Sequence, residues 1–520
     1  MADASLLLGI DLGTSGCKTT LIDMTGRIVA EGMAEISSQH AQPDWSEQRV
    51  EDWMSAMVAS LHELQSHSAW DPRRLAAVAI DGATHSAVLL DDAWKPLRPV
   101  IMWTDGRSAM EVAALERRCG SRILDIAYQS PSPTWTLPQL MWIAAHEPEV
   151  SRATRHILFA KDYLRHQLTG TWETDAIEAQ GTLFYDMARQ TWSQELFQYT
   201  GFRIDALPPI VQPTDIVGTV TAAAASLTGL PQGVPVVAGC SDSAVEDYAA
   251  GAVAPGQGII KLATAGNVNV MTAAAHPDPR TLTYSHVIPG LWYTVVATNT
   301  AASAKRWLRD LFTPAAFADG TTDSIYERMD REAARAPLGS DGLVFHPYLL
   351  GERAPYWDPD LRASFLGLSM RHTREHFIRA LLEGVAYSLR DCYSIIREID
   401  LPLHEIRLIG GGAKSALWSR IVCDVFGMEV MIPDAADASY GSALLAGVGV
   451  GIFSDALTAV RTCVHPSKRL TPDAAAHEHY SALFARYQRM VRSLTEIYRD
   501  CMNKGEKVDD SRNSNGLQLS

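Results

Sequence analysis

The chain has 520 residues, of which 47% are hydrophobic and 20% are charged, and its formal net charge is −15 at pH 7. This composition is typical of a folded globular protein, and a chain well above about 300 residues favours two domains over one. The excess of acidic residues argues against a protein that binds nucleic acid or anionic membranes through a basic surface.

The seven cysteines lie far apart and form no CxxC pair. We therefore predict neither a zinc site nor a disulfide framework, and the odd number of scattered thiols favours a reducing compartment. The N-terminal apolar run ends at Asp11, which is too early for a signal peptide, and no apolar run is long enough to cross a bilayer. These features predict a cytoplasmic protein without a membrane partner.

The chain opens with three short apolar runs, at 5–10, 18–23 and 27–32, which are separated by turn residues. This pattern predicts two consecutive hairpins and hence an antiparallel start to a sheet. The first turn, 11–16, has the glycines and hydroxyls of a P-loop, but the residues after Lys18 have the pattern of a strand and not of a helix. A P-loop is therefore not predicted.

Asp11 makes this first turn a candidate site, because it ends the first strand and opens a turn rich in glycine and hydroxyl side chains. Such a turn exposes backbone N–H groups that can bind phosphate. A carboxylate at a strand end is costly to bury unless a cation meets it, and it can also accept a proton. An ordinary glycine-rich hairpin is the alternative interpretation of the same residues.

Further along the chain, apolar spacing predicts helices at 47–64 and 376–397 and buried strands at 75–80 and 234–238. Strands that alternate with helices predict an α/β fold. The last of these strands leads through small residues into Asp242. This carboxylate is a candidate for accepting a proton from a hydroxyl group, and it is equally suited to cap the start of a helix.

The second half of the chain repeats the opening pattern. Residues 258–262 and 268–271 are predicted strands joined by a turn at 263–267, and 292–297 is a third candidate strand. Because a similar strand–turn–strand pattern lies about 250 residues earlier, we predict a duplicated architecture.

The predicted boundary between the two copies lies near residue 255, which gives an N-terminal domain at 1–254 and a C-terminal domain at 255–500. The residues at 501–520 become polar and repetitive, and we expect a disordered tail there. Within the second domain, three consecutive glycines at 410–412 stand between a predicted strand and an amphipathic pattern. Bare backbone at such a junction can accommodate a flat base or a ribose.

These turns, in this order, resemble those of the FGGY carbohydrate kinases, which are members of the actin-like ATPase superfamily. A more specific resemblance lies in 363–368 and 376–383, which are similar to the C-terminal signature of that family. The stretches at 44–48, 103–107 and 161–170 are also similar to it, and the resemblance runs from about residue 6 to about residue 495. Within the family, the xylulokinase-like members are the most similar.

The resemblance implies two ribonuclease-H-like α/β domains with a central cleft that takes a sugar, ATP and Mg²⁺. It implies that Asp11 holds Mg²⁺ through water and that Asp242 is the general base. The residues that it implies for ATP binding are Thr14, Ser15, Thr264, Gly266, Gly411, Gly412 and Ala413. The residues that it implies for sugar binding are Thr84, His85, Asp105, Asp242 and Ser243.

Several of these residues also have a purely structural interpretation. A histidine at a strand end, such as His85, is as often a hydrogen-bonding partner in the fold as a ligand, and Asp105 is equally suited to a cap. Three features depart from the family pattern: Ser243 stands where asparagine is common, Thr84 stands where methionine is common, and Ala263 and Ala265 stand in a turn that more usually has the sequence Gly-Thr-Ser-Gly.

We therefore predict ATP-dependent phosphorylation of a sugar hydroxyl, with D-xylulose, giving D-xylulose 5-phosphate, as the first candidate. Another ketopentose, a polyol or gluconate are the alternatives, because Ser243 changes the hydrogen-bonding groups presented to a sugar. An actin-like ATPase that acts on a protein partner is a second class, disfavoured because only a short tail follows the second predicted domain. The family resemblance also suggests a homodimer, and no nucleic-acid partner is expected.

Overall fold

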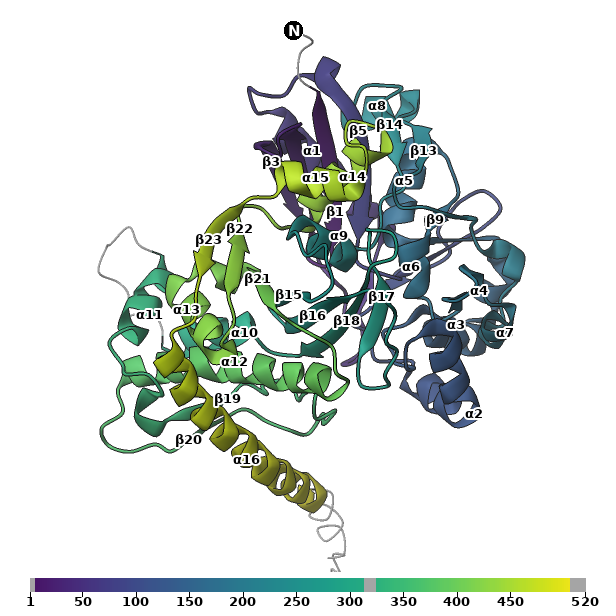
Figure 1. Cartoon of the computed structure of the whole chain (residues 1–520). Helices are drawn as coiled ribbons and strands as arrows, with labels where there is room; N and C mark the ends of the chain where they lie inside the picture. Colours follow the sequence, from purple (N-terminus) through teal and green to yellow (C-terminus); the bar gives the residue numbers. More distant parts are fainter. Residues whose placement is uncertain (1–4, 313–323, 506–520) are drawn as a thin grey trace, which may run out of the picture. The chain divides into compact units, whose positions relative to one another are not determined.

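The computed structural model describes residues 5–312 and 324–505, with side chains described as far as Arg499. The chain forms two compact units, which are coloured along the sequence in Figure 1. The described residues of Met1–Pro255, Met271–Thr294 and Pro433–His465 form unit 1, and those of Gly256–Val270, Val295–Ile432 and Pro466–Ser520 form unit 2.

Unit 1 is built on a sheet whose strands run in the order β13-β14-β5-β1-β2-β3. Strands β1, β2 and β3 pair in antiparallel fashion, which confirms the two predicted hairpins, while β5 is parallel to β1 and β14 is parallel to β5. The bounds are Leu6–Gly13 (β1), Gly16–Asp23 (β2), Ile28–Glu35 (β3), Leu75–Gly82 (β5), Ile216–Thr219 (β13) and Pro235–Val237 (β14).

Two helices pack closely on opposite faces of this sheet. Helix α1 (Val50–Gln65), predicted at 47–64, lies on β3, where a Cβ atom at Gly32 would come within 2.0 Å of the helix backbone. Helix α14 (Ala438–Gly449) lies on β1, where a Cβ atom at Gly9 would come within 1.8 Å of the helix backbone (Figure 1). The strand register puts these two glycines on opposite faces of the sheet.

Unit 1 carries further short strands and helices after β3 and between the strands of its sheet. They are β4 (Glu47–Gln48), β6 (Ala87–Leu90), β7 (Val100–Ile101), α2 (Ala109–Ala127), α3 (Thr136–His146), α4 (Pro148–Ala153), β8 (His156–Phe159), α5 (Ala160–Thr169), β9 (Thr174–Asp175), α6 (Ala176–Gln180), β10 (Tyr185–Asp186), β11 (Thr191–Trp192), α7 (Gln194–Phe197), β12 (Ile210–Val211), α8 (Ala222–Thr228), α9 (Asp242–Ala249), β17 (Leu282–Ser285) and α15 (Ala456–Cys463).

Unit 2 has a second sheet, in which β18, β16, β15, β21, β22 and β23 follow one another in that order. Its strands confirm the predicted strand–turn–strand pattern, and its long helix α12 confirms the helix predicted at 376–397. The bounds are β15 (Gln257–Leu262), β16 (Gly266–Thr272), β18 (Trp292–Thr298), α10 (Ala302–Leu311), α11 (Ile325–Ala333), β19 (Val344–His346), β20 (Ser364–Leu366), α12 (Arg374–Glu398), β21 (Glu405–Ile409), α13 (Ala416–Phe426), β22 (Val430–Pro433), β23 (Pro466–Leu470) and α16 (Ala474–Gly505).

The two sheets share one pairing pattern. Strand β15 pairs antiparallel with β16 and parallel with β21, just as β1 pairs antiparallel with β2 and parallel with β5. Each unit therefore begins with a hairpin whose first strand is also the partner of a parallel strand, as expected for a duplicated α/β architecture.

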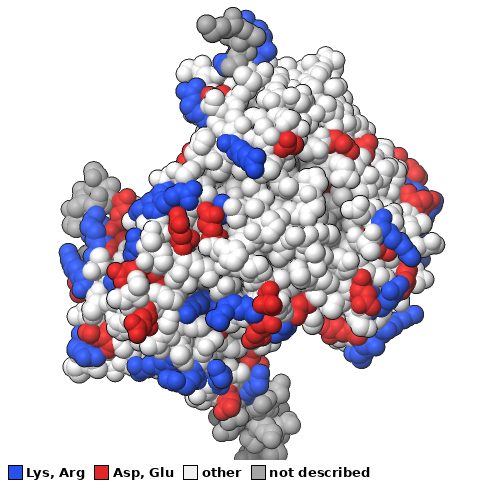
Figure 2. Space-filling model, viewed as in Figure 1, with Lys and Arg blue, Asp and Glu red and all other residues white. Residues whose placement is uncertain are grey.

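Helix α16 ends at Gly505, and the rest of the predicted tail, 506–520, lies outside the described residues. None of the helices that the structure describes is long and apolar enough to span a membrane. On the face shown in Figure 2, the described Lys and Arg side chains are interspersed with Asp and Glu.

Candidate active site

The ends of β1 and β5 bring two carboxylates together in unit 1. Asp11 and Asp81 are partners in the parallel register of these strands. The Oδ1 atom of each is buried and has no hydrogen-bond partner among the described residues, while Oδ2 of Asp81 accepts a hydrogen bond from the Ser442 hydroxyl at 2.5 Å. Strand pairing, and not a local motif, thus creates this acidic site.

The electrostatic surroundings of Asp11 disfavour its charge. Burial and, after it, the negative charge of Asp242 raise the pKa of Asp11 to about 7, and Asp437 and Glu246 act in the same direction. Burial and the neighbouring Asp11 also raise the pKa of Asp81. A cation at this position would relieve the repulsion and satisfy the buried oxygen of Asp11.

The donor set here fits a Mg²⁺ ion that keeps most of its ligands from water and nucleotide. The described residues contain no group of three or more His, Cys, Asp or Glu side chains arranged to hold a metal. Mg²⁺ is commonly bound through one or two carboxylates together with substrate phosphates and waters, so the absence of a closed cage is no obstacle.

The β1–β2 turn is held in place by contacts that the sequence patterns did not predict. The Thr14 carbonyl accepts a hydrogen bond from Gln48 at 2.7 Å, and its hydroxyl accepts one from the Trp103 indole at 2.8 Å. Ser15 is exposed at the tip of the turn. Lys18 forms ion pairs with Glu31 and Asp437, each at 2.7 Å, and so takes no P-loop role in this fold.

Asp242 is the first residue of α9, and Ser241 occupies the N-cap position. Asp242 is therefore not the N-cap residue, and the Ser241 side chain makes no capping hydrogen bond. Asp242 lies in the first turn, where the helix dipole favours a negative charge. Oδ1 of Asp242 accepts hydrogen bonds from the Thr84 hydroxyl at 3.0 Å and from the backbone N–H of Ser243 at 2.7 Å. The carboxylate is thus oriented from two sides.

His85 is a buried, neutral histidine with an unusual backbone. Its φ angle is +56°, its N–H donates to Glu178 at 2.5 Å, and its carbonyl accepts a hydrogen bond from the Thr136 hydroxyl at 2.7 Å. The ring packs on Trp135, and burial lowers the pKa of His85 to about 3. Its Nδ1 atom has no partner among the described residues, so a hydrogen-bonding position remains at this ring.

Glu178 contacts a candidate site residue although it lies in none of the sequence patterns that predict the site. It is 1% exposed, and burial raises its pKa. It belongs to a buried group of charges in which Lys161 pairs with Asp162 at 2.6 Å and with Asp175 at 2.7 Å. The stretch 161–170, noted for its family resemblance, was the only sequence signal for this network.

Both carboxylate oxygens of Asp105 accept hydrogen bonds from other groups of the protein. Asp105 is 2% exposed, and its two oxygens accept hydrogen bonds from the Ser46 N–H at 2.6 Å and from the Arg107 guanidinium at 2.7 and 2.9 Å. Arg107 also pairs with Glu47 and lies over the Trp45 ring, with its Cζ 3.7 Å from the ring centroid. These contacts connect the segments around 45 and 105.

In unit 2, the β15–β16 turn is anchored to the start of α10. The Thr264 carbonyl accepts hydrogen bonds from the N–H of Ala301 at 3.0 Å and from the Ser303 hydroxyl at 2.7 Å. Thr264 itself is exposed. Gly266 is buried, and a Cβ atom there would lie 2.9 Å from Leu389. Thr264 and Gly266 therefore occupy a fixed turn that matches the β1–β2 turn in topology.

The three glycines after β21 meet different structural requirements. Gly410 has a φ of +87°, and a Cβ atom at Gly412 would lie 2.6 Å from Leu262 and 3.1 Å from the Trp418 ring. Gly411, by contrast, is exposed, and a Cβ atom there would meet nothing within 4 Å. Backbone conformation explains Gly410 and packing explains Gly412, whereas Gly411, close in sequence to the buried Ala413, leaves open backbone that suits a flat ligand.

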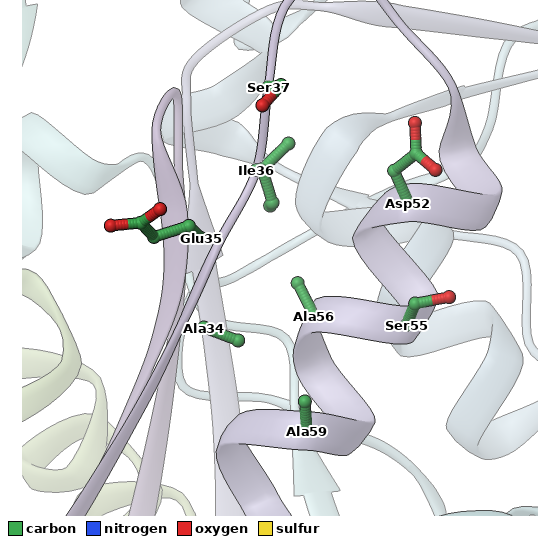
Figure 3. A pocket seen from close by; sticks show the side chains of 8 residues that line it. All are labelled: Ala34, Glu35, Ile36, Ser37, Asp52, Ser55, Ala56 and Ala59. Atoms are coloured by element: carbon green, nitrogen blue, oxygen red, sulfur yellow. The ribbon is translucent and has the colours of Figure 1, made fainter.

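A hollow of about 440 Å³ lies elsewhere in unit 1, between the end of β3 and helix α1 (Figure 3). It is lined by alanines and serines together with Ile36, Glu35 and Asp52. None of the predicted site residues lines it, so it is separate from the site described above.

Comparison with known proteins assigns these two units and their strand-end carboxylates to a family. The N-terminal domain model of the FGGY family of carbohydrate kinases matches residues 6–247, and the C-terminal domain model matches residues 263–450. The chain belongs to the FGGY family of carbohydrate kinases, two-domain α/β enzymes that transfer a phosphoryl group to a sugar.

Three relatives illustrate this membership. The chain is 30% identical over 494 residues to the xylulose kinase of Bacillus subtilis (strain 168), covering 94% of this chain and 97% of that one. It is 28% identical over 501 residues to the gluconokinase of the same organism, covering 95% and 97%. The crystal structure of the xylulose kinase from Rhodospirillum rubrum matches with a TM-score of 0.84 and 31% identity, covering 95% of this chain and 100% of that chain. As a kinase of this family, the chain uses ATP.

Proposed function

We propose that this kinase transfers the γ-phosphoryl group of ATP to a hydroxyl of D-xylulose, giving D-xylulose 5-phosphate, with Asp242 as the general base. The similarity to xylulose kinases supports this substrate, and the similarity to a gluconokinase keeps gluconate, another ketopentose and polyols as alternatives. The observation that supports the mechanism is the oriented carboxylate of Asp242, whose negative charge contributes to the raised pKa of Asp11 in the same unit.

In the proposed reaction, Asp242 accepts the proton of the attacking hydroxyl as its oxygen bonds to the γ-phosphorus, and the bond from that phosphorus to the bridging oxygen breaks to release ADP. Phosphoryl transfer depends on positioning and charge stabilisation more than on covalent chemistry by the protein. Mg²⁺, held through Asp11, would neutralise phosphate charge. His85, Asp105 and Ser243 remain the proposed sugar-side residues.

For the nucleotide we propose the two turns described above and the open backbone after β21. Thr14 and Ser15, together with Thr264 and Gly266, would contact phosphates through hydroxyl and N–H groups. Gly411, Gly412 and Ala413 would flank the adenosine. On this proposal residues 1–254 supply the base and the sugar site, and residues 255–500 supply most of the nucleotide site.

We also propose a cytoplasmic location, where ATP is available, and a homodimer, which light scattering would test.

The decisive experiment is a coupled assay of ADP release with ATP and Mg²⁺ and a panel of ketopentoses, polyols and gluconate. We expect D-xylulose to give the highest kcat/KM. Asp242→Asn is expected to lower kcat by about 10²–10⁴-fold while KM for the sugar changes little, because a positioned base contributes that much. Asp125→Asn, at an exposed position of helix α2, is the matched control. Wild-type turnover in Asp242→Asn, or ADP release stimulated only by a protein, would contradict the proposal.

A further inference from the structure

We propose that Thr84 is a positioning residue that holds the carboxylate of Asp242, and that it acts on turnover through Asp242 and not by contacting the sugar. This inference rests on the proposed role of Asp242 as the base. It changes the role expected for residue 84, which the sequence resemblance places among the sugar ligands.

The first observation is that two donors converge on one carboxylate oxygen. Oδ1 of Asp242 accepts the Thr84 hydroxyl at 3.0 Å and the Ser243 N–H at 2.7 Å. Two hydrogen bonds to one oxygen fix the rotation of the carboxylate plane and reduce the basicity of that oxygen. We therefore assign to Thr84 a share in setting the direction in which Asp242 presents its carboxylate to the attacking hydroxyl.

The second observation is that the rotamer of Thr84 is itself constrained. A Cβ atom at Gly181 would lie 3.0 Å from Cγ2 of Thr84, so the threonine methyl occupies the space beside that glycine which a side chain there would need. The methyl and the hydroxyl of threonine share one carbon atom, and a fixed methyl therefore fixes the hydroxyl. With its methyl against Gly181, Thr84 keeps its hydroxyl on Asp242.

The third observation is that the backbone fixes the separation of the two residues. Gly82 and Ser241 form a parallel β-bridge, two residues before Thr84 and one residue before Asp242. A Cβ atom at Gly239 would lie 1.9 Å from the Ile80 carbonyl oxygen, so these chain segments are in contact before they reach the site. A short side chain with a hydroxyl suits this distance, whereas a methionine has no proton to donate.

The test uses variants that separate the hydroxyl from the methyl of Thr84. Thr84→Val keeps the shape and removes the donor, and Thr84→Ser keeps the donor. With D-xylulose, or with the best substrate of the sugar panel, Thr84→Val should lower kcat roughly 10- to 100-fold with KM within about twofold, the effect of losing one hydrogen bond to a charged and positioned group. Thr84→Ser should restore most of the turnover, and the factor should be the same for every sugar that is phosphorylated.

Thr154→Val is the matched control, because it removes a buried threonine hydroxyl that donates to the Val150 carbonyl at 2.8 Å, at the end of α4. It should keep wild-type kcat. If Thr84→Val fails to fold by circular dichroism, the pair Thr84→Ser and Thr84→Ala isolates the same hydroxyl.

A double-mutant cycle separates failure of this inference from failure of the proposed function. If Thr84 acts through Asp242, Thr84→Val should cause no further loss of kcat in the Asp242→Asn background. Wild-type kcat in Thr84→Val, or a raised KM with unchanged kcat, would overturn the positioning role while leaving Asp242 as the base. Wild-type activity in Asp242→Asn would instead remove the proposed function and, with it, this inference.

Discussion

Asp11 is a carboxylate whose folded surroundings oppose its charge. Its Oδ1 atom is buried and has no partner among the described residues, and burial followed by the charge of Asp242 raises its pKa to about 7. In the unfolded chain the same carboxyl ionises near 3.8. A charge that lowers stability is expected at a position that is kept for binding or catalysis.

Asp11→Asn is therefore expected to raise the melting temperature of the metal-free protein at about pH 8 and to change it much less at about pH 5. The folded pKa is above the unfolded pKa, so stability is lost as the pH rises from 3.8 through about 7. The largest gain corresponds to at most about 4 kcal/mol. Thermal melting in the presence of a chelator at both pH values measures it.

Asp23→Asn, at the end of β2 in the same hairpin, is the control. There, hydrogen bonds from Thr25 and Arg27 outweigh the effect of partial burial and lower the pKa of Asp23. This variant should show no gain at about pH 8. A lower melting temperature of Asp11→Asn at both pH values would show that the charge of Asp11 is not a cost to the fold.

Sequence alone could predict some residues of the candidate site and not others. Asp11 and Asp242 could be found because each lies where an apolar strand meets a turn of small residues. Gln48, Trp103 and Glu178 could not, because each contacts a candidate site residue only after distant segments are brought together. Such tertiary hydrogen bonds leave no local pattern in the chain.

At the scale of elements, the order β14-β5-β1 explains why the carboxylates of unit 1 lie near one another. These strands are parallel, so their C-terminal ends meet at one edge of the sheet, where Asp81 and Asp11 lie and Asp242 follows. Helix α14 supports this edge: its Ser442 holds Asp81, and Asp437 at its N-cap pairs with Lys18. The helix can do so only because it approaches β1 closely at Gly9.

Gly9→Ala is expected to destabilise unit 1 strongly. A Cβ atom at Gly9 would lie 1.8 Å from the Ser439 carbonyl oxygen and 2.6 Å from the Ala443 nitrogen, and these are backbone atoms that move only with the whole helix. Overpacking of this kind costs roughly 1–3 kcal/mol or more. Urea unfolding measures the change in the free energy of unfolding.

Gly120→Ala is the matched control in helix α2, because the nearest atom to a Cβ there is 4.0 Å away. It should be nearly neutral, since the added methyl group meets no crowded atom. Equal effects of the two substitutions would show that the close approach at Gly9 is not a constraint on α14.

Helices and strands, like site residues, were predictable where they depend on local sequence and not where they depend on contacts between distant segments. The hairpins and the helix at 47–64 were predictable because strand and helix periodicities are local properties. That residues 433–465 join unit 1 was not, because helix α14 contacts a strand more than 400 residues earlier in the chain. The shape that accepts the helix is set by Gly9, and a single glycine has no periodicity.

At the scale of the whole molecule, the two units carry buried groups with opposite effects on stability against pH. In unit 1, burial lowers the pKa of His286 to about 3, and its Nδ1 accepts a hydrogen bond from the Ile288 N–H at 3.0 Å. In unit 2, burial raises the pKa of Glu352 to about 7, although it accepts hydrogen bonds from Thr298 and from the N–H groups of Asn299 and Arg353.

The two shifts predict opposite pH dependences. Below 6.5 the unfolded chain protonates His286 while the folded protein does not until about pH 3, so stability present above 6.5 is lost as the pH falls. For Glu352 the folded protein holds its proton up to about pH 7 while the unfolded chain loses it near 4.5, so stability is lost as the pH rises through that window.

Substitutions that remove each titration should therefore tilt the stability curve in opposite directions. His286→Asn keeps an acceptor for the Ile288 N–H. Its free energy of unfolding relative to wild type should be about 2 kcal/mol higher at about pH 5 than at about pH 8. Glu352→Gln should do the reverse: its free energy of unfolding relative to wild type should be up to about 3 kcal/mol higher at about pH 8 than at about pH 5, because the titration of Glu352 is removed. The glutamine amide can donate a hydrogen bond to the Thr298 hydroxyl, from which the carboxylate accepts one. Urea unfolding of both variants and wild type at the two pH values measures these differences, which do not depend on any packing cost that is constant with pH. Curves that remain parallel to wild type would show that neither buried group changes its protonation on unfolding in the way that the fold requires.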